Sequence, residues 1–535
     1  MNANKTLYVC LILMMIAIGI GCSQTTGFEY NTPPPNSQTN FDKQNKAALI
    51  SKEMPELVPG RYIVVFKDQG EGKISEQAAR QAVLKTNAIF SDFNIKQDSL
   101  IHQYKYAAKG FAAKLTDSQA EQLRKDSRIE TVVQDVKYAA LGSFNPVNIS
   151  YRAKRTQTID WGVARVGGPL DGTGKRAWVL DTGIYLTHND LNVDATNSVS
   201  FVATESAHDL NGHGTHVAGI IAAKNNNDGT AGVAANAEVV SVKVCDQNGT
   251  CYVSDVKAGV DYAANNYTSG EVANISIRYP TNISSLPQID IALSILEDAI
   301  KAAADDGLLF TLIAGNEKDD VKDYSPSRLA YPRVFVTSSI HDDDDFSVSF
   351  SCNPNQGSNY GSSISYAAPG DDILSLWSGG GTAVACGTSQ AAPHLAGLLL
   401  MNGINLATDG YAANDPDNNP DPIAVDGVVA PVITASIDNY NPKLSWSSVL
   451  GAVEYEVYRS FETGSWSKIA TVSTTSHTDG TVMNQNLQVI SSPPYTMDDF
   501  YTYKVRAVPS NGPKSNFSIV KYFSVGECTG PGCSS

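Results

Sequence analysis

The sequence predicts an α/β protein in which helices cover both faces of a mostly parallel sheet. A small α+β domain precedes this sheet, and a β-sandwich follows it. A chain of 535 residues is too long for one ordinary domain. Between about residues 161 and 427, short β-branched runs alternate with helix-like stretches, which indicates a covered parallel sheet. Residues 430–525 contain only short strands separated by turns, which is typical of a sandwich.

The first 22 residues predict an export signal. Lys5 provides the positive start, and the apolar run Leu7–Ile20 is shorter than the ~20 residues that span a bilayer. Cys22 leaves two alternatives: it lies beside a simple cleavage site, or it is the lipidated first residue of a lipoprotein. "GIGC" resembles a lipobox except at Gly19. We therefore expect a secreted protein, either extracellular or attached to the cell envelope, with no transmembrane helix.

The segments on either side of the first domain are polar. Residues 23–55 are rich in proline and polar residues and predict a disordered tether. Residues 56–140 read as strand, helix, strand, helix and strand, with Thr116 and Ser118 as candidate helix caps. Residues 141–160 form a polar connector, and residues 526–535 a short tail.

Charge and cysteine content narrow the class of protein. The formal net charge of −16 argues against a nucleic-acid binder. Six cysteines remain beyond the export segment, and an even number in an exported chain predicts disulfides, with free buried thiols as the alternative. The local pairs are Cys245 with Cys251, Cys352 with Cys386, and Cys528 with Cys533. Their spacings do not predict a zinc site.

Three motifs indicate nucleophilic catalysis. Asp181 ends the apolar strand "AWVLDTGI", His213 opens the helix in "NGHGTHVAGIIAA", and Ser389 opens that in "CGTSQAAPHLAGLLL". A serine hydroxyl needs a neighbouring base, histidine titrates near neutrality, and a carboxylate fixes the imidazole tautomer. A fourth residue, Asn316, follows the strand "LLFTLIAGNE" and can donate to a developing oxyanion.

These motifs resemble the subtilisin-like serine proteases over roughly residues 156–402, in the chain order Asp, His, Ser. The resemblance implies a serine endopeptidase that cuts internal peptide bonds through an acyl-enzyme. Residues 56–140 resemble the inhibitory propeptide of this family. We therefore expect a monomeric zymogen that cleaves itself between about Ala139 and Arg155.

The resemblance also implies substrate and metal sites. Peptide substrates would join as an added strand along "NISI" and "TLIAG". The predicted substrate-binding residues are Asn274, Ile275, Ser276, Ile277, Ala314 and Gly315. The chain departs from the family pattern at Arg278 and Tyr279, where two glycines are usual, and a bulky or charged rim there would narrow specificity. A structural calcium ion would bind Gln157, Asp190 and Asn226.

Several other features predict structure rather than chemistry. His216 and His394 are expected to be buried packing residues, and His188 a surface turn residue. The acidic run His341–Phe346 is expected to be a solvated loop. Gln390 replaces the methionine common after the nucleophile, which predicts resistance to peroxide.

The C-terminal domain resembles a fibronectin type III module through Trp446 and Tyr503. It would bind a surface or polymer, or simply stabilise the enzyme. Two competing functions remain: a surface-attached binding protein with an idle catalytic domain, and an esterase, which the lack of a G-x-S-x-G elbow disfavours.

Overall fold

The computed structural model describes residues 54–67, 75–139, 146–150, 156–281, 287–427, 431, 433–448, 452–461, 465–482, 487–490, 500–509 and 521–525. The predicted export signal with Cys22, residues 23–53 of the tether, the Cys528–Cys533 pair and half of the connector lie outside these residues. Within them, no helix has the length and apolarity needed to cross a bilayer.

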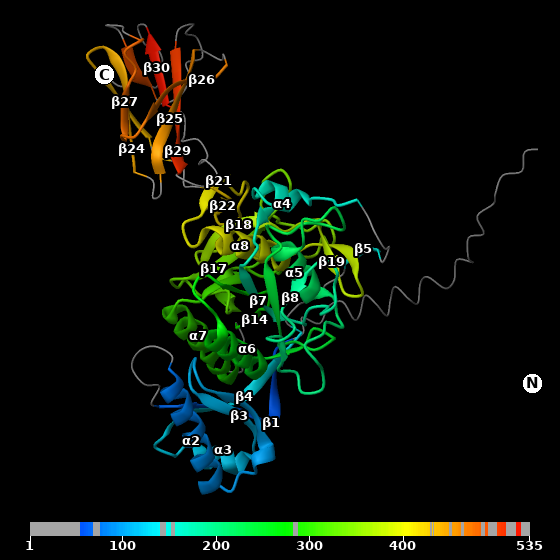
Figure 1. The fold of residues 1–535 in the computed structure, drawn as a ribbon. Coiled ribbons are helices and arrows are strands. Elements are labelled where there is room, and N and C mark those ends of the chain that lie inside the picture. The colour runs from blue at the N-terminus through cyan, green and yellow to red at the C-terminus, as the bar shows by residue number, and fades with distance from the viewer. Residues whose placement is uncertain are drawn as a thin grey trace, which may run out of the picture. The chain divides into compact units, whose positions relative to one another are not determined.

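The N-terminal domain is a small α+β unit (Figure 1). Its elements are β1 (Glu56–Phe66), α2 (Glu76–Asp92), the 3-10 helix η1 (Gln97–Ser99), β2 (Leu100–Tyr104), β3 (Gly110–Lys114), α3 (Asp117–Leu123) and β4 (Ile129–Tyr138). Of the two candidate caps, Thr116 caps α3 and shares a capping box with Gln119. The strand order β4-β1-β3-β2 leaves β4 on one edge, where it pairs with a strand from the next domain.

The central domain is built on a ten-stranded sheet. Its order is β21-β22-β18-β17-β15-β13-β7-β11-β8, with β9 also paired to β11, and only β21 runs antiparallel to its neighbour. The strands are β7 (Arg176–Asp181), β8 (Asn192–Val193), β9 (Val199–Ser200), β11 (Glu238–Lys243), β13 (Val272–Ile275), β15 (Leu309–Ile313), β17 (Val334–Ile340), β18 (Ile364–Pro369), β21 (Ala407–Tyr411) and β22 (Pro422–Val425).

Helices cover both faces of this sheet, as the alternation predicted. α6 (Val253–Asn266) and α7 (Pro287–Asp306) pack on one face, and α5 (His213–Ala222) and α8 (Thr388–Asn402) on the other (Figure 1). The strand β7 divides its side chains between them: Trp178 and Leu180 enter the first core, and Ala177 and Val179 the second. Such a two-faced apolar strand is typical of a buried parallel sheet.

Smaller elements surround the sheet. They are the short helix α4 (Trp161–Arg165), the 3-10 helix η2 (Val321–Asp323), the parallel pair β6 (Leu170–Asp171) and β10 (Ala234–Ala235), the antiparallel pair β14 (Tyr279–Pro280) and β16 (Tyr324–Ser325), the edge strand β12 (Cys251–Tyr252), and the sheet β19 (Ile373–Trp377), β20 (Gly381–Ala385) and β5 (Val147–Ser150). Two of the predicted disulfides are present, Cys245–Cys251 and Cys352–Cys386.

The C-terminal domain consists of two antiparallel sheets. One contains β23 (Ile433–Asp438), β24 (Asn441–Trp446) and β27 (Ser476–Thr478); the other contains β26 (Ser467–Val472), β25 (Ala452–Phe461), β29 (Phe500–Pro509), β30 (Lys521–Val525) and β28 (Leu487–Ile490). Leu444 and Trp446 from the first sheet share one apolar core with Val457 and Tyr503 from the second. The two sheets therefore form a sandwich.

Candidate active site

The carboxylate of Asp181 and the imidazole of His213 are in direct contact. Asp181 is the last residue of β7, and His213 is the first residue of α5. The Nδ1 atom of His213 lies 2.8 and 2.9 Å from the two carboxylate oxygens, and both side chains are fully buried. Because an ionised carboxylate only accepts hydrogen bonds, Nδ1 carries the proton and Nε2 holds the lone pair. His213 is thus arranged as a general base.

Asp209 fixes the start of α5, and the sequence reasoning missed it. Its Oδ1 accepts hydrogen bonds from the backbone N–H groups of Asn211 and Gly212, both at 2.9 Å. Its Oδ2 accepts from the N–H and the hydroxyl of Thr215, at 3.0 and 2.6 Å. These bonds satisfy N–H groups that a helix start leaves unpaired. The sequence offered one signal for this role, an Asp two residues before the segment "NGHGT" in which the helix begins.

Close backbone approach explains the glycine after His213. A Cβ on Gly214 would collide with the carbonyl oxygen of Gly183 and would lie 3.1 Å from the Asp181 Cβ. Any larger residue would push α5 away from the end of β7. The spacing between the His213 ring and the Asp181 carboxylate therefore depends on this glycine.

Ser389 is the second residue of α8, in the first turn, where backbone N–H groups are not consumed by the helix. The helix α8 packs against α5 and against β13, β15 and β17, which bring the two helix starts to the same end of the sheet. A polar chain supports the Ser389 backbone: the Ser276 hydroxyl donates to the Ser389 carbonyl at 3.3 Å, and the Asn274 amide donates to Ser276 at 2.9 Å. The Cys352–Cys386 disulfide anchors the residues just before Ser389.

The amide of Asn316 is oriented by Thr388. Its Oδ1 accepts hydrogen bonds from both the backbone N–H and the hydroxyl of Thr388, each at 2.9 Å. Because the oxygen end is engaged, the Nδ2 group is the end that can donate elsewhere. That nitrogen lies 3.2 Å from the position of a Cβ on Gly387, two residues before Ser389. The geometry suits a donor to an oxyanion formed at Ser389.

The two strands predicted to bind substrate, β13 and β15, are internal to the sheet. The strand β13 lies between β7 and β15, and β15 lies between β13 and β17, so neither has an open edge. The predicted residues Asn274 and Ile275 are thus already paired. The backbone N–H of Ala314 donates to Thr337, and that of Gly315 donates to the Thr388 hydroxyl. Pairing by Ser276 and Ile277, beyond the end of β13, stays a prediction.

The propeptide adds a strand to the catalytic domain at β12. The propeptide strand β4 runs antiparallel to it, with Tyr138 opposite Cys251 and Lys137 opposite Tyr252. The Cys245–Cys251 disulfide links this edge to the end of β11, and the backbone N–H of Cys245 donates to the carbonyl of Asp181 at 3.2 Å. An extended propeptide strand is thus held at a sheet edge that a disulfide links to the end of β11 and that a backbone hydrogen bond connects to Asp181.

Arg278 and Tyr279 do not form an exposed rim. Arg278 is only 3% exposed, and its guanidinium pairs with Glu317, the residue after Asn316, with Nε 2.8 Å from Oε1. Its pKa is raised above the ordinary value: burial is the largest single effect and lowers it, but the charge of Glu317, the hydrogen bond to Glu317 and the neighbouring tyrosines together outweigh burial. Tyr279 is fully buried and pairs with Ser325 in the β14–β16 ladder. The two residues that were expected to form a bulky or charged rim are therefore buried, and the charge of Arg278 is neutralised by Glu317.

The three predicted calcium ligands lie together. The amide nitrogen of Asn226 donates to Asp190 Oδ1 at 2.8 Å, and the backbone N–H of Asn227 donates to Gln157 Oε1 at 3.3 Å. Gln157 Nε2 donates to the carbonyls of Lys224 and Thr230. Burial raises the pKa of Asp190 to about 6. A nearly buried carboxylate, two side-chain amides and two backbone carbonyls thus belong to one hydrogen-bonded cluster, which contains the oxygen types that calcium prefers.

Three of the remaining histidines, His188, His216 and His394, are buried. His216 Nε2 lies 3.1 Å from the Ala383 carbonyl, and His394 Nδ1 lies 2.8 Å from the Gln390 carbonyl, as expected of packing residues. Burial lowers their pKa values to about 3 and about 4. His188 was expected at the surface, but it is buried, because its turn folds inward and its Nδ1 accepts from the Asp190 N–H. His341 is half-buried, and its Nδ1 lies 2.8 Å from Asp371 Oδ2.

Comparison with known proteins agrees with this geometry. Residues 177–402 match the model of the subtilase family, and residues 61–140 match that of the peptidase inhibitor I9. The chain belongs to the subtilase family of serine peptidases, and an inhibitor I9 domain precedes its catalytic domain.

The similar proteins are named as serine proteases. Proteinase R of Parengyodontium album is 31% identical, over 68% of this chain and 85% of that protein. An extracellular serine proteinase of a Thermus strain is 30% identical, over 69% and 85%. Alkaline serine exoprotease A of Vibrio alginolyticus is 33% identical, over 64% of this chain but only 60% of that protein.

Proposed function

We propose that the chain is the precursor of a secreted serine endopeptidase in which Asp181, His213 and Ser389 form the catalytic triad. The contact of His213 Nδ1 with Asp181, at the end of the sheet where α8 presents Ser389, carries this proposal. Nε2 of His213 takes the Ser389 proton while Oγ attacks the carbonyl carbon of the substrate. The Asn316 amide and the Ser389 N–H stabilise the oxyanion.

The two halves of the reaction use the same base. When the tetrahedral intermediate collapses, the leaving amine takes the proton from His213, and the acyl group stays on Ser389. Water then donates a proton to His213 and attacks the ester, and Ser389 recovers its proton as the acid product leaves. Each residue acts from a position fixed by a strand end or a helix start.

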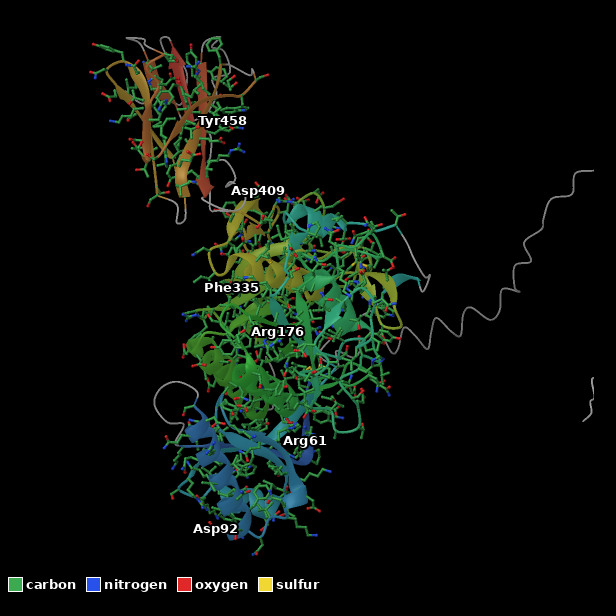
Figure 2. All side chains as sticks on the ribbon, viewed as in Figure 1. Arg61, Asp92, Arg176, Phe335, Asp409 and Tyr458 are labelled. Carbon is green, nitrogen blue, oxygen red and sulfur yellow. A yellow bond between two sulfur atoms is a disulfide. The ribbon has the colours of Figure 1, made fainter. Side chains whose placement is uncertain are left out.

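The N-terminal domain acts as an inhibitor because its strand β4 occupies the β12 edge. Arg61 (labelled in Figure 2) links the two domains: its Nε is 2.6 Å from Asp135 on β4, and its Nη2 is 2.5 Å from the Ser254 hydroxyl on α6. Tyr138 pairs with Cys251, and Val147 pairs with Val384 in β20, five residues before Ser389. The scissile bond is therefore proposed to lie between Ala139 and Val147.

Gln157, Asp190 and Asn226 are proposed to bind calcium, together with carbonyl oxygens of Lys224 and Thr230. The ion would neutralise the buried Asp190 carboxylate and cross-link two loops, without taking part in the reaction. The support is the hydrogen-bonded cluster that these groups form with a carboxylate whose pKa burial has raised. Excess chelator should lower Tm at pH 8 and have little effect in Asp190→Ala. An unchanged wild-type Tm would contradict the site.

Export through residues 1–22 is proposed from the sequence, with lipidation of Cys22 as the open alternative; intact mass of the matured protein decides between them.

The sandwich is proposed to be a fibronectin type III-like module. Its Tyr503 hydroxyl donates to buried Asp479 at 2.8 Å, which fixes the core without suggesting any chemistry.

A casein assay on the wild type and Ser389→Ala tests the enzyme. We expect the substitution to abolish hydrolysis and to leave an uncut precursor. A Ser389→Ala protein that matures without another protease would contradict self-processing. Absence of activity in both proteins, with polymer binding by residues 430–525, would favour a binding protein with an idle catalytic domain.

A further inference from the structure

The side chain of Gln390, the residue after Ser389, is buried without a partner. It is 0% exposed, and neither its Oε1 nor its Nε2 makes a hydrogen bond to any residue that the structure describes. An unpaired buried polar atom costs about 1–3 kcal/mol, whereas an apolar side chain of similar volume would cost nothing. This cost needs a compensating role.

The Gln390 amide points toward the reacting end of α8. Its Oε1 lies 3.2 Å from the position of a Cβ on Gly387, and the Nδ2 of Asn316 lies 3.2 Å from the same position. The two amides therefore flank Gly387, the N-cap of α8. The backbone of Gln390 is already engaged, because its N–H donates to Gly387 and its carbonyl meets His394. Only the side-chain amide has bonding capacity left.

We propose that Gln390 is a positioning residue for the water that hydrolyses the acyl-enzyme, an inference that rests on the proposed function. A primary amide both accepts and donates hydrogen bonds, which matches water. The oxyanion needs donors only, and the Ser389 hydroxyl is activated by His213. Gln390 would thus act mainly on the second half of the reaction.

The step is a simple hydrolysis. The water oxygen forms a bond to the acyl carbon, and one water proton passes to Nε2 of His213. Oε1 of Gln390 accepts a hydrogen bond from the other water hydrogen and orients the water. The bond between the acyl carbon and Ser389 Oγ then breaks, and His213 returns the proton to that oxygen. The acid product carries the added oxygen.

Pre-steady-state kinetics with a p-nitrophenyl ester separates the two halves of the reaction. The matured wild type, Gln390→Met and Gln390→Asn are compared: methionine removes the amide at similar volume, and asparagine withdraws it by one methylene. The burst rate reports acylation, and the steady-state rate reports deacylation. We expect the burst rate to stay within about twofold and deacylation to slow about tenfold, the effect of losing one hydrogen bond of ~1.4 kcal/mol.

A competing nucleophile provides an independent readout. Hydroxylamine should capture a larger share of the acyl-enzyme in Gln390→Met, by about the same tenfold factor, because only water loses its positioning group. Thr337→Val is the matched control, since the Thr337 hydroxyl is also buried without a partner but lies in β17. This control should leave both rates and the partition ratio unchanged.

Three results would overturn the inference. Burst and steady-state rates that fall together would assign Gln390 to acylation or to folding. A change in Tm with unchanged kinetics would show that the amide binds a structural water only. An unchanged partition ratio would show that water is not positioned there. A wild type without any burst, or a burst that survives in Ser389→Ala, would instead contradict the proposed function.

Discussion

A single carboxylate on α6 holds one turn of the propeptide. Asp261 accepts hydrogen bonds from three consecutive backbone N–H groups, those of Lys105, Tyr106 and Ala107, at 3.0, 2.8 and 2.7 Å. Burial raises the pKa of Asp261 above its ordinary value. Lys257, one turn earlier on α6, donates to two carbonyls that follow in the same propeptide turn. This contact lies outside the β12 edge, where substrate is proposed to bind.

The substitution Asp261→Asn tests the strength of this contact. Two N–H groups can still reach Oδ1, but their bonds are no longer charge-assisted and lose about half their strength, about 1 kcal/mol each. The amide nitrogen then faces the N–H of Lys105, and that bond, worth about 1.5–3 kcal/mol, is lost. Since such losses are not fully additive, we expect a net cost of about 3 kcal/mol, or roughly 150-fold weaker inhibition.

The assay is the inhibition constant of the cleaved propeptide for the matured enzyme, together with the lag before activity appears. Asp261→Asn should shorten the lag and leave kcat/KM for a short peptide unchanged. Asp298→Asn on the neighbouring helix α7, an exposed Asp-to-Asn change, is the control. An inhibition constant within threefold of the wild type would refute the assigned role of Asp261.

Three further predictions concern buried groups near the catalytic domain. Glu317→Gln removes the carboxylate charge that pairs with the buried Arg278 and should cost about 3–5 kcal/mol in the free energy of unfolding, with recovery when Arg278→Met is added. Burial raises the pKa of Asp421 from 3.8 to about 7, so its stabilising contribution is complete below pH 3.8 and is lost as pH rises through 7. Asp421→Asn should thus change the free energy of unfolding little at pH 4 and raise it by up to about 4 kcal/mol above pH 8; equal effects at both pH values would contradict this. Dilute peroxide should spare the wild type but inactivate Gln390→Met, as mass spectrometry of the oxidised residue can verify.

The catalytic residues could be predicted from the sequence because each depends on a local pattern. Asp181 ends an apolar strand, and His213 and Ser389 each open an apolar helix within a few residues of a glycine. The parallel sheet that brings them together follows from the alternation of strands and helices. Two of the cysteine pairs were also predictable, because short sequence separation and an even count restrict the choices.

The pairing of β12 with the propeptide strand β4 could not be predicted from the sequence in the same way. The strands β13 and β15 are short apolar runs like any others, and only the strand order places them inside the sheet. The pairing of Tyr138 with Cys251 joins residues 113 positions apart, and β12 is only two residues long. Periodicity carries no signal for such a contact. The burial of Arg278 likewise depends on Glu317, a partner supplied by a different strand end.

Inhibition and catalysis therefore depend on different parts of the same surface. The β12 edge pairs with β4 in the precursor, and we propose that an extended substrate occupies the same edge in the mature enzyme, so that the two exclude each other. Substitutions at β12 would therefore weaken both the binding of the propeptide and the binding of substrate. Asp261 on α6 accepts from backbone N–H groups of a propeptide turn that an extended substrate lacks, and Lys257 donates to carbonyls of that turn and lies 3.5 Å from the ring centre of Tyr104. Affinity for the inhibitor can thus change at α6 while the peptide-binding edge stays the same, which is why the kcat/KM of Asp261→Asn separates the two roles.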